Sequence, residues 1–188
     1  MGHIVGYDAG TSEQWVGWTA GASEEAEEFV RGLGLGAALE PGYLRAVADL
    51  EQILVDGRSL AGGLWYPDPA DLPWGQFTLT SLYPEAGTPF DPAALLQRVR
   101  KAEKIRGTRL LDHSTALGDV DAGRVLMKVE VRGFKDTGVV LSRIAATVFP
   151  TGADEAMRFE FQTNVPTAFE ALSGEALTIV QSLTVEVA

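Results

Sequence analysis

The chain contains no cysteine, which excludes disulfide bonds, thiolate nucleophiles and cysteine-ligated metal sites together. Histidine, the usual general acid or base, occurs only twice in 188 residues. No apolar run approaches the roughly 20 residues that a membrane-spanning helix needs. The first residues lack the basic region and apolar core of a signal peptide. We therefore expect no membrane span, and a cytoplasmic location is the simplest one.

Positive charge is scarce: 15 lysines and arginines stand against 26 acids, for a formal net charge of −11. Such a surface repels nucleic acid over most of its area and suits a basic partner. Residues 98–109 reverse this trend, with six cations and one acid. We interpret this cluster as the solvated side of one amphipathic helix, because no aromatic residue lies among the cations to stack on bases. The sequence thus predicts no nucleic-acid partner.

Three strands in a row form the clearest pattern that is present. In residues 124–132, four apolar side chains (Val125, Met127, Val129 and Val131) point one way and four charged ones (Arg124, Lys128, Glu130 and Arg132) point the other, as a half-buried strand requires. A glycine-bounded turn leads into a second strand over 139–149. A proline-glycine turn then leads into a third strand, over 157–163, that alternates again.

One helix follows these strands and has to lie across them. Pro166 ends the sheet pattern, and the apolar residues beyond it share one helical stripe. Apolar residues recur every second position in the third strand and about every 3.6 positions in the helix, so each element has one apolar face, and the two faces can pack together. We predict that Phe159, Phe161, Ile179 and Leu183 form one core.

The remaining elements are predicted from the same kinds of signal. Strands are expected at 14–19, 60–66, 76–83 and 108–117. Helices are expected at 23–31, from Pro41 to 56, and from Asp91 to Arg106 with Pro92 at its first position. The fold class is therefore α+β, a single antiparallel sheet of about six to seven strands with helices packed on it and a closing C-terminal helix. We expect one domain over 1–188, made of a helical N-terminal extension (1–58) and a core (59–188).

No catalytic constellation is visible. Asp112, His113 and Ser114 are consecutive in a predicted strand, so their side chains alternate between faces and cannot form a triad. The glycines at positions 32, 34 and 36 follow a predicted helix, whereas a dinucleotide loop must follow a strand and open a helix. We expect no catalytic residue, no metal site and no cofactor. A hydrolase that uses carboxylates alone stays open, since carboxylate spacing depends on the fold.

The loop between two predicted strands, residues 65–74, is the strongest candidate for binding. It holds three prolines, which restrict their own φ and the residues before them. Its rings, Trp65, Tyr66 and Trp74, have two interpretations. They close the end of the core, or they form a stiff aromatic lip for a peptide or an apolar ligand, because Trp and Tyr are enriched at binding hot spots.

The order of elements from residue 60 onward resembles the PsbP-like fold, shared by PsbP, the Ran-binding Mog protein and LpqN-type actinobacterial proteins. The residues that carry the likeness are the strands over 124–163, the break at Pro166 and the final Ile179-Val180-Gln181-Ser182-Leu183. The first sixty residues have no evident counterpart. The resemblance implies accessory binding to partner proteins, and it offers no catalytic residues to carry over.

Together, these observations predict a non-enzymatic protein-interaction or accessory domain, such as a secretion-associated adaptor or chaperone, with another protein as its partner. The alternative, from a different class, is a small apolar ligand-binding protein with a pocket between sheet and helices. A cavity lined by Trp and Phe favours the second hypothesis, whereas an exposed apolar patch without a cavity favours the first.

Overall fold

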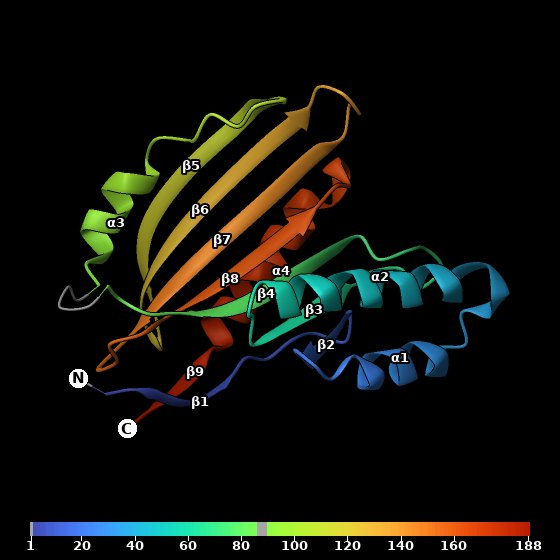
Figure 1. The fold of residues 1–188 in the computed structure, drawn as a ribbon, viewed down its shortest axis with the longest axis horizontal. Coiled ribbons are helices and arrows are strands. Elements are labelled where there is room, and N and C mark those ends of the chain that lie inside the picture. Colours follow the sequence, from blue (N-terminus) through green and yellow to red (C-terminus); the bar gives the residue numbers. More distant parts are fainter. Residues whose placement is uncertain (1, 86–89) are drawn as a thin grey trace.

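The computed structural model describes residues 2–85 and 90–188, and it has the predicted α+β fold (Figure 1). Seven antiparallel strands form the main sheet in the order β2-β3-β4-β8-β7-β6-β5. A separate pair, β1 with β9, joins the two ends of the chain. The strands are β1 (Ile4–Asp8), β2 (Trp15–Thr19), β3 (Ala61–Trp65), β4 (Gly75–Leu82), β5 (Thr108–Val120), β6 (Gly123–Phe134), β7 (Val140–Pro150), β8 (Ala156–Thr163) and β9 (Thr184–Val187).

Helices cover both faces of the sheet. They are α1 (Ser23–Gly32), α2 (Gly36–Asp56), α3 (Pro92–Val99), the short 3₁₀ helix η1 (Pro166–Ala168) and α4 (Phe169–Ser182). In Figure 1, α4 crosses behind β8, whereas α1 and α2 lie at the opposite end of the molecule from α3. Within the described residues, no helix is both long enough and apolar enough to cross a membrane.

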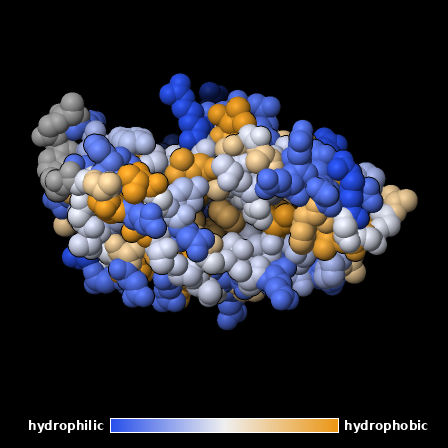
Figure 2. All heavy atoms as spheres, turned by 90° about the horizontal axis from the view of Figure 1, so that it is seen from below, coloured by the Kyte–Doolittle hydropathy of each residue, from blue (hydrophilic) through white to orange (hydrophobic). Residues whose placement is uncertain are grey.

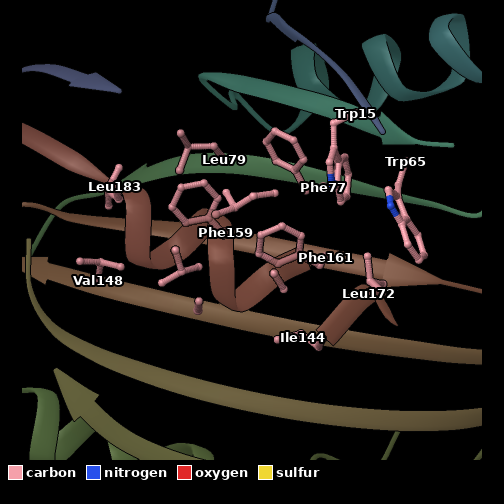
Figure 3. Packing of buried hydrophobic residues seen from close by; sticks show 14 of the residues in the cluster. Trp15, Trp65, Phe77, Leu79, Ile144, Val148, Phe159, Phe161, Leu172 and Leu183 are labelled. Atoms are coloured by element: carbon pink, nitrogen blue, oxygen red, sulfur yellow. The ribbon is translucent and has the colours of Figure 1, made fainter. Parts of the chain in front are cut away.

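The main core lies between α4 and the sheet. Phe159 and Phe161 of β8 stack with ring centroids 5.9 Å apart and planes 10° apart. Both are buried in one cluster with Ile179 and Leu183. Figure 3 labels Phe159, Phe161 and Leu183 within this cluster. The predicted meeting of these four side chains is therefore confirmed.

A second core lies on the opposite face of the sheet. Leu64 and Trp65 are adjacent in β3, so their side chains point to opposite faces. Trp65 belongs to the α4 core, whereas Leu64 belongs to the core beneath α1 and α2. Helix α3 lies on this same second face. Phe90, just before α3, packs edge-on against Phe149, which alternates with the α4-side Val148.

Helix α3 is shorter than predicted. Asp91 caps it as expected, accepting a hydrogen bond of 2.9 Å from the N–H of Ala93, but the helix ends at Val99 rather than at Arg106.

Arg132 of β6 contacts the non-helical segment beyond α3. Its guanidinium donates a hydrogen bond of 2.7 Å to the C=O of Glu103, which satisfies that carbonyl outside a helix. Ile105, which lies inside the predicted helix, is in a non-helical segment and is 48% exposed. The cations of residues 98–109 therefore do not share one helical face, and that interpretation was wrong.

The N-terminal part differs from the prediction in three ways. Helix α2 begins at Gly36, so Pro41 lies inside it rather than at its start. Residues 1–58 are more than a helical extension, because the strand predicted at 14–19 is β2 and pairs with β3 of the main sheet from end to end. Strands β1 and β9 were not predicted. The glycine run itself is a turn between two helices, where Gly34 and Gly36 have φ of +65° and +75°.

Candidate functional site

The three predicted binding residues lie in different surroundings. Trp65 is 1% exposed and stacks on Trp15, with ring centroids 6.1 Å apart. Tyr66 is 7% exposed, and its hydroxyl donates a hydrogen bond of 2.7 Å to the C=O of Glu13. Trp74 is half-buried at the surface. Trp65 and Tyr66 thus close the two cores, and Trp74 is the ring of this loop that retains surface for a contact.

The loop that carries Trp74 is fixed to the body of the protein. The Trp74 N–H donates a hydrogen bond of 2.8 Å to the C=O of Trp65, and its ring packs edge-on against the Trp65 ring, with centroids 6.2 Å apart. The hydroxyl of Tyr43 in α2 donates to the C=O of Asp71 at 2.8 Å, and burial raises the pKa of Tyr43 to about 12. Thr163 of β8 donates to the C=O of Trp74. The Trp74 ring is therefore held in place before any partner arrives.

A pocket of about 240 Å³ lies between Trp74, α2 and the ends of β4, β7 and β8. Three amide side chains contribute to its wall: Gln76, Gln162 and Asn164. The side-chain nitrogen of Gln76 is buried and has no hydrogen-bond partner among the described residues. Because an unmet buried donor is costly, this amide is a candidate to receive an acceptor from a bound molecule.

A strip of the sheet between α2 and α3 forms the second part of the candidate site. Its side chains alternate with residues of the α4 core, so they point to the face that α2 and α3 flank. We call this strip the open face and define it by Gln76, Thr78 and Thr80 of β4, Arg158, Glu160 and Gln162 of β8, Arg143, Ala145 and Thr147 of β7, and Lys128 of β6.

Arginine side chains dominate the accessible part of the open face. The side chains of Arg143 and Arg158 are 44% and 37% exposed, while Ala145 and Thr147 between them are buried. Arg143 and Arg158 both pair with Glu160, the latter at 2.5 Å. Small buried residues and large exposed arginines together give the open face a cationic outer layer.

A second carboxylate, Glu130 of β6, holds two more cations beside the open face. Lys128 pairs with it at 2.8 Å, and Arg132 pairs with it from the buried side. Burial alone would raise the pKa of Glu130, but the hydrogen bonds and charges of Arg132 and Lys128 outweigh burial and lower the pKa from 4.5 to about 2. Glu130 is therefore an ionised, structural side chain at neutral pH.

Another concavity, of about 370 Å³, lies on the α4 side of the sheet, beside Gly17 and Thr19 of β2 and Ala61 of β3. We call it the β1 cleft, because the end of β1 and the residues after it form one wall. Gly17, Ala61 and edges of the core rings Phe77 and Phe159 line it, and Asp8 is among its polar residues. Figure 2 looks onto the side of the molecule that carries β1 and α1, and a hollow is visible near the centre of this view.

The consecutive Asp112, His113 and Ser114 lie in β5 as the alternation predicts. His113 pairs in register with Glu130, and Asp112 accepts a hydrogen bond of 2.8 Å from the backbone N–H of His113 rather than from its ring. Over residues 2–85 and 90–188, no three histidine or acidic side chains converge as metal ligands would.

Comparison with known proteins gives a likeness of fold. No protein-family model and no curated protein matches the sequence. The structure is similar to that of LpqN of Mycobacterium tuberculosis, a protein involved in cell envelope biogenesis. The TM-score is 0.51, the identity is 12%, and the match covers 95% of this chain and 82% of that one. A Bacteroides thetaiotaomicron structure matches over 96% of this chain and 45% of its own, with a TM-score of 0.40 and 11% identity.

The LpqN-like fold extends further than the sequence suggested. A match over 95% of the chain includes most of the first sixty residues, for which we expected no counterpart. At 12% identity the likeness concerns the fold alone. The resemblance to PsbP and to the Ran-binding Mog protein stays a prediction.

Proposed function

We propose that this chain is a non-enzymatic accessory domain that binds another protein through the open face, with Trp74 at one end of the contact. The observation that carries the proposal is the strip of sheet between α2 and α3, with Trp74, Arg143 and Arg158 at its surface. Trp and Arg are the residue types most enriched at binding hot spots.

Preorganisation supports this site over a mobile loop. The backbone and ring of Trp74 are held by Trp65 and Thr163, and Arg143 and Arg158 are each oriented by Glu160. Side chains that are already ordered lose less entropy on binding. An adaptor or chaperone needs such a surface and no chemistry, and this is the role we propose. A cytoplasmic location stays a prediction.

Site-specific photo-crosslinking tests the proposal. A photoreactive amino acid at Thr78, on the open face, is expected to give a discrete adduct in a lysate of the source organism. The same amino acid at Glu28, an exposed residue of α1, is the matched control and is expected to give none. An adduct at Glu28 alone would place the contact elsewhere.

The partner identified in that adduct is then purified and titrated. Trp74→Ala is expected to weaken its affinity about 30-fold, since losing a hot-spot ring costs about 2 kcal/mol. Phe29→Ala is the control, because it removes a 42% exposed ring from α1 instead. Full affinity in a folded Trp74→Ala variant would overturn the proposal.

The β1 cleft supports a second candidate function, binding of a small apolar ligand. Its volume of about 370 Å³ lies within the usual range for ligand sites, and the rings of Phe77 and Phe159 contribute to its lining. Titration with an environment-sensitive apolar dye, followed by mapping of protected amides, tests this candidate. Saturable binding that protects Gly17 and Ala61 would favour it, and the absence of saturation would dismiss it.

A further inference from the structure

The charges of the open face and its border do not balance. Two carboxylates, Glu130 and Glu160, are shared among four cations: Lys128, Arg132, Arg143 and Arg158. Each carboxylate thus holds two cations and leaves one positive charge uncompensated. In a chain with a formal net charge of −11, this local surplus is the opposite of the average.

The surplus extends along the edge of the open face that α3 borders. Arg98, Arg100, Lys101, Lys104 and Arg106 form no ion pair with any residue in the described parts of the chain. Residues 98–158 hold twelve of the chain's fifteen cations against eight acids, whereas residues 1–85 hold three arginines against thirteen acids. The charge is therefore separated along the sequence, and the cations of the open face belong to the part with a positive balance.

Two buried donors on this face also lack acceptors. The Nε of Arg158 and the side-chain nitrogen of Gln76 are both buried and have no hydrogen-bond partner among residues 2–85 and 90–188. Both groups can only donate, so the ligand they suit is an acceptor. Carboxylate oxygens meet this need and also match the positive charge.

We infer that the open face binds an acidic segment of the partner protein, a stretch rich in aspartate and glutamate. This inference rests on the proposed function, and it replaces the basic partner that the average charge suggested. A nucleic acid fits less well for two reasons. Glu160 interrupts the cations and would repel a continuous phosphate backbone. Among the residues that define the open face and line its pocket, Trp74 is also the one aromatic side chain, where stacking needs several.

Fluorescence anisotropy with synthetic probes tests the inference without a known partner. The probe is a fluorescein-labelled peptide of alternating glutamate and alanine, and the comparison probes are a lysine–alanine peptide of equal length and a single-stranded oligonucleotide. The full chain is expected to bind the glutamate peptide saturably at low salt. Added salt is expected to weaken binding strongly, since screening acts over about 8 Å at physiological ionic strength.

Charge-removing variants locate the contact. The double variant R143Q/R158Q is expected to weaken binding of the glutamate peptide about tenfold, because each exposed charge pair contributes up to about 1 kcal/mol. R45Q is the matched control, since it removes an 83% exposed arginine from α2, in the acidic half. If the double variant fails to fold, R143Q alone carries the test, with an expected loss of about threefold.

Three results would overturn the inference: tighter binding of the oligonucleotide or the lysine peptide, an equal loss in R45Q, or no saturable binding of the glutamate peptide. A fourth result would be self-association of the chain that depends on its concentration and is abolished in R143Q/R158Q. The acidic segment would then be α1 of a second copy of this chain, and this result would count against a separate partner protein. If the crosslinked partner docks on the open face through a neutral or basic segment, the proposed function stands and this inference fails.

Discussion

Replacing Phe159 by alanine tests how β8 packs on α4. This packing also orients the open face, because Arg158 and Glu160 lie on the other side of the same strand. The ring is 1% exposed and lies beside Phe161 and Phe77, with centroids 5.9 Å and 6.3 Å away. Losing this buried side chain removes a transfer free energy of about 2 kcal/mol.

The cavity left behind adds to this loss. A hole on the order of 100 Å³ that stays empty costs roughly 2 kcal/mol more, at about 24 cal/mol per Å³. The free energy of unfolding is thus expected to fall by about 4 kcal/mol. Urea denaturation followed by circular dichroism measures it, with an unchanged m-value showing that the midpoint shift reports stability.

Phe134→Ala provides the matched control, since this ring lies in the same sheet but is 39% exposed. It is expected to cost well under 1 kcal/mol. A loss below about 1 kcal/mol in Phe159→Ala, or equal losses in the two variants, would refute the placement of Phe159 in the core.

Two further predictions concern other parts of the sheet. The lowered pKa of Glu130 means that its carboxylate stabilises the fold above pH 4.5 and that this contribution, on the order of 3 kcal/mol, is lost as the pH falls toward 2. In the Glu130→Gln variant, the free energy of unfolding is expected to fall less steeply between pH 4.5 and pH 2 than in the unmodified chain. An equally steep fall in both proteins would contradict this. Gly63→Ala places a Cβ 2.6 Å from Phe77 and 2.9 Å from the C=O oxygen of Val16, so we expect a loss of about 1–3 kcal/mol in thermal unfolding. Gly118→Ala is its control, because the nearest side chain lies 3.8 Å away, and equal effects would argue against the crowding.

The strands from β6 to β8 and helix α4 could be predicted from the sequence because each buries one face. Val129, for example, lies between the charged Lys128 and Glu130, and Phe159 and Phe161 are separated by Glu160. Alternation of this kind follows directly from burying one face of a strand. It can therefore be recognised in the sequence without knowing which strand lies beside it.

Other elements carry no such local signal. Strands β1 and β9 are largely exposed, and each exists because the other end of the chain pairs with it, as Ile4 does with Val187. The segment after α3 contacts Arg132, which lies in strand β6 and donates a hydrogen bond to the C=O of Glu103, so its path involves a residue distant in the sequence. The open face likewise depends on strand order, since Arg143 and Glu160 meet only when β7 and β8 pair. The predicted aromatic site likewise depends on distant elements. Whether Trp65 is buried and Trp74 lies at the surface depends on where α2 and α4 pack, and the sequence pattern around these residues does not give that position.

The order of strands also bears on how the chain folds. Strands β5 to β8 neighbour one another in the order in which they occur in the sequence, so three hairpins can form through local contacts. Strand β4 pairs with β8 across residues 83–155, and closing that long loop costs more entropy than closing a hairpin. The seam between β4 and β8, where Phe77 meets Phe161, is therefore expected to form after the hairpins. A destabilising substitution in β4 at this seam would therefore mainly raise the unfolding rate. A destabilising substitution within the hairpins would instead lower the folding rate.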